Sequence, residues 1–437
     1  MKGLIIAGTA SGTGKTVATL VVLRALENIG EDPQPAKVGP DFIDPSHHRA
    51  LTGKPSRTLD IWLEGKDGMI ENYHRGQGSI CIAEGVMGLY DGDRTSTAKV
   101  AEVLGLPVVL VVDGSAGMES VAATALGFRE YADHLGLDLK IAGVISQKTR
   151  PGRHEQGIKD GLPDDLTYFG RIPPMDDLEI PERHLGLFMG NQATVSKEKL
   201  DRAGRDIDVG SLVDAAREPK LKGGKRSVEA GTPDDVKIGI AYDGAFNFVY
   251  PGTREKLNEV ELITFSPLED DPLPDMDGVY LPGGYPELHA ERLEESTTLK
   301  DLAERAKNGL PVFGECGGMM VMCEGMRAKD GELYEMAGIL PARVKMVDEL
   351  QALGYVELKG KDDSAVCRKG AKLRGHEFHY SGIEIGRNPE FAFDVSRGTG
   401  MDGSHEGLMR YNSLGTYTHF HGESGAFDRF IVRLKGS

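Results

Sequence analysis

The first half of the chain alternates strand-like segments with segments whose apolar residues recur at helical spacing. Between Val17 and Ile29, for example, the leucines repeat along one face of a helix. The run Val108–Val112 is apolar without a break, as in a strand that is buried on both faces of a sheet. The expected strands are Leu4–Ala7, Gln34–Val38, Ser79–Ala83, Val108–Val112 and Ile141–Ile145. This alternation predicts an α/β fold with a mostly parallel sheet and helices on both of its faces.

The second half begins a new set of strands after a segment rich in glycine, proline and charge, 217–235. We expect strands at Val236–Tyr242, at Asp277–Leu281 before a Pro-Gly-Gly turn, and at Leu310–Phe313. A polar segment with almost no large apolar residue is typical of a linker between domains. The sequence therefore predicts a first domain over 1–217, a linker over 218–235 and a second α/β domain over 236–437.

The first strand leads into a glycine-rich stretch, then Gly-Lys-Thr, then the expected helix. This is the context of a phosphate-binding loop, in which backbone N–H groups and a helix N-terminus face an anion. Lys15 would reach the terminal phosphates of a nucleotide, and the Thr16 hydroxyl would hold Mg²⁺. The spacing is irregular, because Thr9 stands where glycine is usual and Gly8 lies one residue earlier. The predicted nucleotide-binding residues are Gly8, Ser11, Gly12, Thr13, Gly14, Lys15 and Thr16.

Carboxylates follow two further strands of the first half directly. In open α/β sheets, ligands bind at these carboxyl ends of the strands. Glu84 can complete the Mg²⁺ shell begun by Thr16, and Asp41 can join it or orient a phosphorylated intermediate. For Asp41, the alternative to a ligand role is an Asp-Pro turn. Asp91 has glycines at 88 and 92 on either side, and the sequence fits a turn residue there as well as a ligand. The predicted metal ligands are Thr16, Asp41 and Glu84.

A cysteine lies at the other prominent turn of the chain. The strand before it runs into Gly-Glu-Cys-Gly-Gly, and apolar residues beyond predict a helix. A strand-turn-helix elbow exposes a nucleophile, and the helix N-terminus is expected to lower the pKa of the Cys316 thiol. The other cysteines, Cys81, Cys323 and Cys367, lack this elbow, and a buried structural role is expected for them.

A cysteine nucleophile needs a base, and the second half offers two histidine clusters. One contains His376 and His379, and the other contains His419 and His421 near the C-terminus. In His419-Phe420-His421, strand alternation would put both imidazoles on one face. The residues themselves leave the choice between the clusters open.

Composition narrows the class of protein. The chain has 437 residues, of which 39% are hydrophobic and 27% charged, as in a globular protein with two or three domains. A formal net charge of −17 argues against a nucleic-acid binder and fits an acidic, salt-adapted surface. No apolar run approaches the ~20 residues of a membrane span, and Met1 leads straight into the first strand without room for a signal peptide. Four scattered cysteines indicate a reducing cytoplasm.

Taken in the order in which they occur along the chain, the motifs resemble those of the cobyrinic acid a,c-diamide synthases. They are similar also to those of the hydrogenobyrinic acid and Ni-sirohydrochlorin a,c-diamide synthases. The resemblance implies an N-terminal P-loop NTPase-type ATP-binding domain like dethiobiotin synthetase. It implies a C-terminal class I glutamine amidotransferase domain of the triad type. The matching stretches are Ala7–Thr16, Lys37–Pro45, Glu84–Gly92, Leu281–Glu287, Gly314–Gly318, Gly375–Ser381 and Tyr417–His421.

The resemblance also implies roles for individual residues. Cys316 becomes the glutaminase nucleophile and His419 the residue that raises its nucleophilicity. Ordinary class I amidotransferases carry glutamate two residues after this histidine, whereas this chain carries His421, so a Cys–His dyad is expected. N–H groups near Gly284 and Gly317 would hold the oxyanion. Two departures from the pattern are Phe42, where many relatives have tyrosine, and Gln147, where related ATP domains commonly have asparagine.

The implied reaction is ATP-dependent amidation of the a and c carboxylates of cobyrinate, in cobalamin biosynthesis. Glutamine supplies ammonia, an acyl phosphate is the activated intermediate, and Mg²⁺ is the cofactor. The expected partners are therefore a corrinoid, L-glutamine and ATP, without nucleic acid or membrane. The same chemistry on hydrogenobyrinate or Ni-sirohydrochlorin is one alternative, and a partitioning-type ATPase with a degenerate second domain is another. The sequence leaves the oligomeric state open, a homodimer being one candidate.

Overall fold

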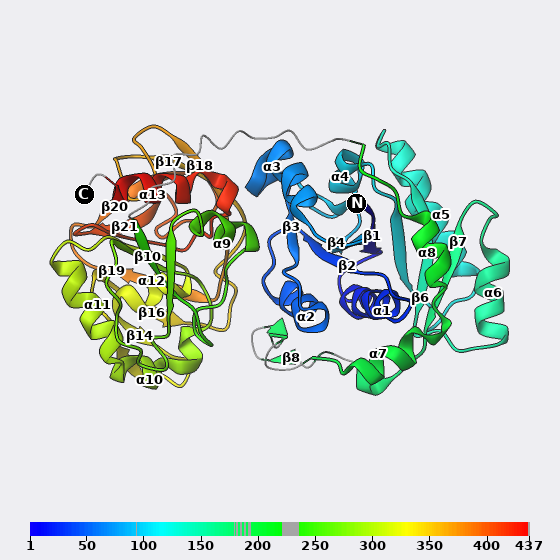
Figure 1. Ribbon diagram of the computed structural model, residues 1–437, viewed down its shortest axis with the longest axis horizontal. Helices are drawn as coiled ribbons and strands as arrows, with labels where there is room; N and C mark the ends of the chain where they lie inside the picture. Colours follow the sequence, from blue (N-terminus) through cyan, green and yellow to red (C-terminus); the bar gives the residue numbers. More distant parts are fainter. Residues whose placement is uncertain are drawn as a thin grey trace. The chain divides into compact units, whose positions relative to one another are not determined.

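The computed structural model divides into two compact units, Met1–Arg226 and Ser227–Ser437 (Figure 1). It describes residues 1–92, 94–178, 180, 182–183, 186–187, 189–190, 194–220 and 236–435. The division falls inside the predicted linker, 218–235, but residues 221–235 of that linker lie outside the described part of the chain. The domain limits that we drew from the sequence therefore stay a prediction.

A seven-stranded sheet forms the centre of the first unit, in the order β3-β2-β4-β1-β5-β6-β7. All of its neighbouring strands pair in parallel, which confirms the α/β prediction for this half. The phosphate-loop strand β1 lies between β4 and β5, so the loop after it opens at the middle of the sheet edge. The strands are β1 (Lys2–Gly8), β2 (Pro33–Val38), β3 (Arg57–Leu59), β4 (Ile80–Gly88), β5 (Val108–Asp113), β6 (Ile141–Gln147) and β7 (Thr167–Ile172).

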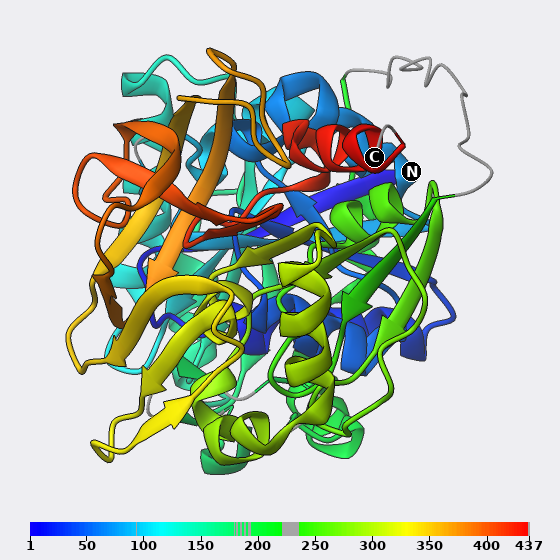
Figure 2. The ribbon, with the colours of Figure 1, turned by 90° about the vertical axis from the view of Figure 1, so that its left-hand side faces the viewer.

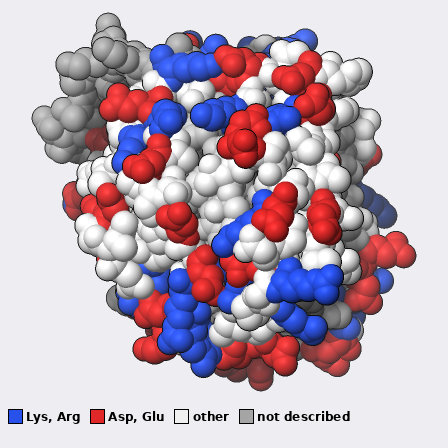
Figure 3. Space-filling model, turned by 90° about the vertical axis from the view of Figure 1, so that its right-hand side faces the viewer, with Lys and Arg blue, Asp and Glu red and all other residues white. Residues whose placement is uncertain are grey.

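Helices connect these strands, and a short two-stranded pair, β8 (Glu182–Arg183) with β9 (Gly186–Leu187), follows them. The helices are α1 (Lys15–Asn28), α2 (Ile43–Thr52), α3 (Ile61–Arg75), α4 (Thr97–Leu104), α5 (Glu119–His134), α6 (Arg153–Gly161), α7 (Lys197–Ala203) and α8 (Val209–Ala215), with 3-10 turns η1 (Asp176–Leu178) and η2 (Gly204–Asp206). On the face of this unit shown in Figure 3, basic and acidic side chains are interspersed. Ion pairs in this unit include Arg202 with Asp177, 2.7 Å apart.

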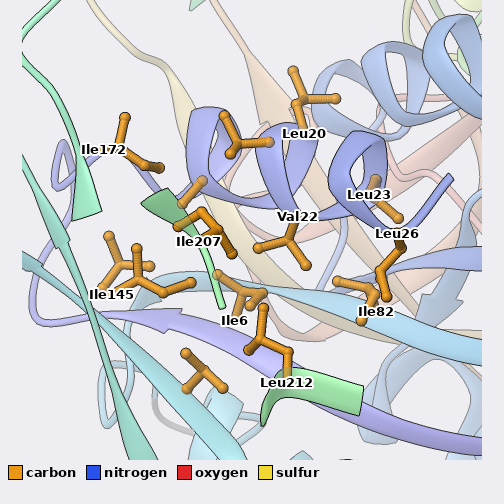
Figure 4. Packing of buried hydrophobic residues seen from close by; sticks show 14 of the residues in the cluster. Ile6, Leu20, Val22, Leu23, Leu26, Ile82, Ile145, Ile172, Ile207 and Leu212 are labelled. Atoms are coloured by element: carbon orange, nitrogen blue, oxygen red, sulfur yellow. The ribbon is translucent and has the colours of Figure 1, made fainter. Parts of the chain in front are cut away.

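The core of the first unit lies on both faces of its sheet. Successive residues of β1 point to opposite faces, so Leu4 and Ile6 join one apolar cluster while Ile5 and Ala7 join the other. Figure 4 shows the first cluster, where side chains of α1 such as Val22 pack over Ile6 and its neighbours. A strand covered on both faces must be apolar throughout, which is why β1 and β5 read as unbroken apolar runs.

The second unit contains a nine-stranded mixed sheet, in the order β11-β10-β12-β13-β22-β21-β20-β17-β18. Strands from β11 to β22 pair in parallel, and those from β22 to β18 pair antiparallel. The strands are β10 (Lys237–Ala241), β11 (Glu261–Phe265), β12 (Gly278–Leu281), β13 (Val312–Glu315), β17 (Ala352–Gly360), β18 (Lys372–His379), β20 (Glu390–Arg397), β21 (His405–Arg410) and β22 (Ser413–Thr416).

A smaller sheet, in the order β15-β14-β16-β19, completes this unit (Figure 2). Its strands are β14 (Cys323–Arg327), β15 (Leu333–Glu335), β16 (Leu340–Met346) and β19 (Ser381–Ile385). The C-terminal helix α13, red in Figure 2, adds Phe427, Phe430 and Leu434 to the core cluster of the large sheet. The helices are α9 (Pro251–Leu257), α10 (Ala290–Glu295), α11 (Thr297–Lys307), α12 (Gly317–Met322) and α13 (Ala426–Leu434), with 3-10 turns η3 (Pro286–His289) and η4 (Gly422–Ser424).

Among the residues described, no helix is both long and apolar enough to cross a membrane. All four cysteines are free thiols and buried.

Candidate functional site

The loop between β1 and α1 is shaped by two glycines in the left-handed region. Gly12 has φ +78° and Gly14 has φ +80°, a backbone conformation that residues other than glycine rarely adopt. A Cβ on Gly14 would lie 2.8 Å from Nε2 of Gln147, whereas Gly12 faces open space. Gln147 donates a hydrogen bond from this amide to the carbonyl of Gly14, at 2.9 Å. Gln147 thus supports the loop from β6, a contact that sequence reasoning missed.

Lys15 begins α1 and folds back over this loop. Its Nζ donates a hydrogen bond to the carbonyl of Ala10, at 3.2 Å, and the side chain is buried. Burial, and then the neighbouring Lys37 ammonium, lower the pKa of Lys15. The tip of the loop, from Ala10 to Gly12, is exposed. A lysine held in this way, beside exposed backbone N–H groups at a helix N-terminus, is suited to bind an anionic phosphate.

Glu84 is fully buried and is the centre of a network of charged side chains. The expectation that it directly follows its strand is wrong, because β4 continues past it to Gly88 and Glu84 pairs with Ile6 inside the sheet. Its Oε1 accepts hydrogen bonds from Thr16 Oγ1 at 2.8 Å and from Lys37 Nζ at 3.0 Å. Its Oε2 lies 2.8 Å from Nε2 of His48, whose Nδ1 lies 2.9 Å from Ser56 Oγ. The structure therefore brings the predicted ligands Thr16 and Glu84 together.

Lys37, at the end of β2, neutralises the carboxylates around it. It pairs with Asp44, and its Nζ lies 3.4 Å from Asp41 Oδ2. Although burial opposes its charge, Asp44, Glu84 and Asp41 raise the pKa of Lys37 well above its usual value. Burial, with the like charge of Asp44, raises the pKa of Asp41 to about 7. Sequence reasoning did not single out Lys37, although a lysine at the carboxyl end of a buried strand is a usable signal.

The third predicted ligand, Asp41, uses one oxygen to hold the start of α2. Its Oδ1 accepts hydrogen bonds from the backbone N–H of Ile43 at 2.8 Å and of Asp44 at 3.3 Å. These bonds give Asp41 a local turn role, but the turn is not the Asp-Pro turn weighed as the alternative, because Phe42 follows Asp41. Asp91 also serves a turn, since its Oδ2 accepts from the N–H of Gly88 at 2.9 Å.

The side chains around Thr16 fit a Mg²⁺ ion that is bound together with a nucleotide. No group of three or more histidine, cysteine or acidic side chains in the described ranges is arranged to hold a metal by itself. Mg²⁺, however, usually takes one or two protein oxygens and fills its shell with phosphate oxygens and water. Thr16 Oγ1 and Glu84 Oε1, 2.8 Å apart, are oxygens of this kind.

Cys316 stands at the elbow between β13 and α12, as predicted. Its φ of +44° is strained for a residue with a side chain, and its N–H donates to the carbonyl of Thr416 at 2.6 Å. The expected lowering of its thiol pKa is wrong for the free protein. Burial, and then Glu287, raise the pKa of Cys316 to about 12, and only 6% of the residue is exposed.

His419 follows the strand next to that of the cysteine. Strands β13 and β22 pair in parallel, with Glu315 opposite Thr416, so Cys316 and His419 lie after the carboxyl ends of adjacent strands. The two histidine clusters meet at His419. The N–H of His376 donates to the carbonyl of His419 at 3.1 Å, and the N–H of His419 donates to the carbonyl of His376 at 2.8 Å. Burial lowers the pKa of His419 to about 4.

The other histidines of the two clusters occupy separate environments. The ring centroids of His376 and His419 are 6.0 Å apart, while His379 stacks on Tyr417 at 3.8 Å. His421 packs against Tyr250, with centroids 5.3 Å apart. The prediction that His419 and His421 share one face of a strand is wrong, since β22 ends at Thr416, before both.

A buried glutamate that sequence reasoning missed lies beside His419. Oε2 of Glu315 is 3.7 Å from Nδ1 of His419, and both side chains are 2% exposed. Tyr280 donates its hydroxyl to the same oxygen at 2.8 Å, and the N–H of Phe420 donates to Oε1 at 3.1 Å. Burial raises the pKa of Glu315 to about 8. The available signal was a charged residue inside the apolar strand directly before the cysteine, because such residues are rarely buried unless paired.

The two glycines predicted for the oxyanion site lie close to each other. A Cβ on Gly317 would be 3.0 Å from the backbone nitrogen of Gly284, and a Cβ on Gly284 would overlap the carbonyl of Ala245. Only glycine allows this close approach of the two backbones. Both sit beside the elbow, Gly317 directly after Cys316 and Gly284 after β12.

Two family models match the chain, one in each unit. Residues 4–188 match the CobQ/CobB/MinD/ParA nucleotide binding domain. Residues 237–427 match the CobB/CobQ-like glutamine amidotransferase domain. The first range contains the loop with Lys15 and the second contains the elbow with Cys316.

Curated relatives match over almost the whole length. A protein of Haloarcula marismortui named cobyrinate a,c-diamide synthase is 56% identical, covering 99% of both chains. A protein of the same name from Halobacterium salinarum is 54% identical, covering 99% of this chain and 98% of the relative. A hydrogenobyrinate a,c-diamide synthase of Rhizobium meliloti is 39% identical, covering 96% and 99%.

Proposed function

Because this chain belongs to the cobyrinate a,c-diamide synthase family, we propose that it amidates the a and c carboxylates of cobyrinate, using ATP and the amide nitrogen of glutamine. It is then a glutamine-dependent ligase of cobalamin biosynthesis. One observation carries the proposal: a single chain holds both a phosphate loop with Lys15 and a cysteine elbow at Cys316. A cytoplasmic setting belongs to the proposal, since all four cysteines are free thiols.

In the first unit, the proposed task is to activate the carboxylate. Hydroxide is a poor leaving group, so phosphoryl transfer from ATP to the carboxylate would give an acyl phosphate. The backbone of residues 8–14 and the ammonium of Lys15 would stabilise the negative charge of the phosphates, which the fold of the loop supports. Thr16 and Glu84 would hold Mg²⁺, which supplies further positive charge when bound. Lys37 keeps the surrounding carboxylates neutralised.

In the second unit, the proposed task is to release ammonia from glutamine. The thiol of Cys316 attacks the side-chain amide carbon of glutamine, and its proton passes to His419 and then to the departing nitrogen. The backbone N–H groups at Gly284 and Gly317 are proposed to bind the oxyanion. Water then hydrolyses the thioester to glutamate. The overall change is glutamine and water to glutamate and ammonia, and the ammonia displaces phosphate from the acyl phosphate.

The experiment compares tetrapyrroles under identical conditions. The full-length protein is incubated with Mg²⁺, ATP, glutamine and either cobyrinate, hydrogenobyrinate or Ni-sirohydrochlorin, and the products are weighed by mass spectrometry. We expect cobyrinate to gain two amides, with a monoamide at one equivalent of glutamine. A diamide formed only from hydrogenobyrinate or the nickel compound would overturn the choice of substrate. ATP turnover that is independent of glutamine and yields no amide from any of them would overturn the whole proposal.

A further inference from the structure

Glu315 is placed to act on His419, and this inference rests on the proposed glutaminase reaction. The carboxylate and the imidazole are 3.7 Å apart, and both are almost completely screened from water. At such a site, a charge interacts more strongly than it does at the surface. The distance is longer than a hydrogen bond. Burial raises the pKa of Glu315 to about 8, so the two groups interact through charge in the fraction of the protein in which Glu315 is ionised, and this fraction grows as the pH rises toward 8.

Two donors fix the position of the Glu315 carboxylate. The Tyr280 hydroxyl, from β12, donates to Oε2, and the N–H of Phe420 donates to Oε1. Because Phe420 directly follows His419, the second bond ties the carboxylate to the same turn that carries the imidazole. The carboxylate and the imidazole are therefore held in register by the backbone as well as by their own interaction.

The two rings that pack around His419 carry no negative charge. Phe248 and His376 approach it, with ring centroids 6.4 and 6.0 Å away. Burial lowers the pKa of His376 to about 3, so this imidazole is neutral. His421, at the position where ordinary class I amidotransferases carry an acid, packs against Tyr250 instead.

We propose that Glu315, the residue before the nucleophile, is the positioning residue that orients His419 and stabilises its protonated form. Facing Nδ1, it favours the tautomer with a proton on that nitrogen, which leaves Nε2 to accept the thiol proton of Cys316. The imidazolium formed in that step is stabilised by the carboxylate until the proton passes to the leaving nitrogen. The triad acid is thus supplied from the cysteine strand rather than from the histidine turn.

The test measures glutamine hydrolysis by the full-length protein, as kcat and KM, for Glu315→Gln and His421→Gln. By analogy with loss of an orienting acid elsewhere, Glu315→Gln should lower kcat about 10²-fold or more with little change in KM for glutamine. His421→Gln should lower kcat by less than about 5-fold, because its ring packs against Tyr250. Amidation driven by added ammonium salt should be unchanged in both variants, which shows that each is folded.

Retention of kcat within about 2-fold by Glu315→Gln, or a larger loss for His421→Gln than for Glu315→Gln, would overturn the inference. If Glu315→Gln loses ammonia-dependent activity as well, the Tyr280→Phe variant is used in its place. Tyr280→Phe removes only the hydroxyl that donates to Oε2 of Glu315. This variant should lower kcat about 3- to 10-fold with KM unchanged, and an unchanged kcat would contradict the inference. A wild-type protein without any glutamine hydrolysis would instead overturn the proposed function.

Discussion

In the first unit, the buried ammonium of Lys37 pairs directly with carboxylates of the site, whereas in the second unit Cys316 and His419 are neutral. Lys37 lies among Asp41, Asp44 and Glu84, so positive and negative charges are in place before any ligand arrives. By contrast, burial raises the pKa of Cys316 to about 12 and lowers the pKa of His419 to about 4.

The difference follows from the two kinds of chemistry. Phosphoryl transfer moves a group that is already anionic, so fixed charges can stabilise it throughout. In thiol chemistry, the thiolate and the imidazolium form only when the proton moves from cysteine to histidine. Because Cys316 and His419 are buried and neutral, we expect this proton transfer to occur only once glutamine is bound. We therefore expect substitutions in the two units to be separable by the choice of nitrogen source.

The largest expected effect comes from Cys316→Ala. Without the thiol, glutamine-dependent amidation should fall by at least about 10⁴-fold, while ammonia-dependent amidation stays within about 2-fold of wild type. The measurement is diamide formation with glutamine or with ammonium salt. Cys367→Ala, a buried cysteine outside the elbow, is the control and should keep both activities. Equal loss of both activities in Cys316→Ala would contradict a division of labour between the units.

A smaller but broader effect is expected for Lys15→Met. Removing one group that stabilises phosphate charge should lower kcat about 10²- to 10³-fold, and it should do so with either nitrogen source. Glutamate release by the second unit, assayed in the absence of ATP, should continue. Lys66→Met, on the exposed side of α3, is the control and should leave all three rates unchanged. A defect confined to the glutamine-dependent reaction would place Lys15 outside the phosphate site.

The smallest expected effect concerns the stability of the second unit between pH 6.5 and 8. Burial, and then Glu377, raise the pKa of Glu406 to about 8, above its value of about 4.3 in an unfolded chain. The folded state therefore binds a proton that the unfolded state has lost, and stability falls as the pH rises through this window. Buried His419 acts in the opposite sense, but only below about pH 6.5, where the unfolded imidazole is protonated.

Replacing Glu406 by glutamine should reduce this pH dependence, and Glu315, whose pKa burial also raises to about 8, should maintain the remainder. The change in slope cannot exceed about 1.4 kcal/mol per pH unit, the value for one proton. Urea unfolding of the second unit at several pH values measures it, and Asp394→Asn on β20, an exposed acid, is the control. Parallel pH profiles for wild type and Glu406→Gln would show that Glu406 is already ionised in the folded protein.

Local turns of both sites were predictable from the sequence. The glycines at 12 and 14 encode positive φ directly, and the glycine-rich surroundings of Cys316 encode the elbow. The same holds for the buried strands, because an unbroken apolar run such as that of β5 fits a strand covered on both faces. The predicted strand through His419 and His421 failed because alternation over three residues is too short to show where β22 ends.

By itself, the sequence determined the two α/β units, the phosphate loop, the cysteine elbow and the family, since each is encoded in neighbouring residues or in their order. Only the tertiary structure decided which charged groups meet: Lys37 with Glu84, Gln147 with the loop at Gly14, and Glu315 with His419. These contacts depend on strand order. The N–H of Phe420 reaches Glu315 across 105 positions because β13 and β22 are neighbours in the sheet. No local pattern specifies that adjacency, which is set by the packing of the whole unit.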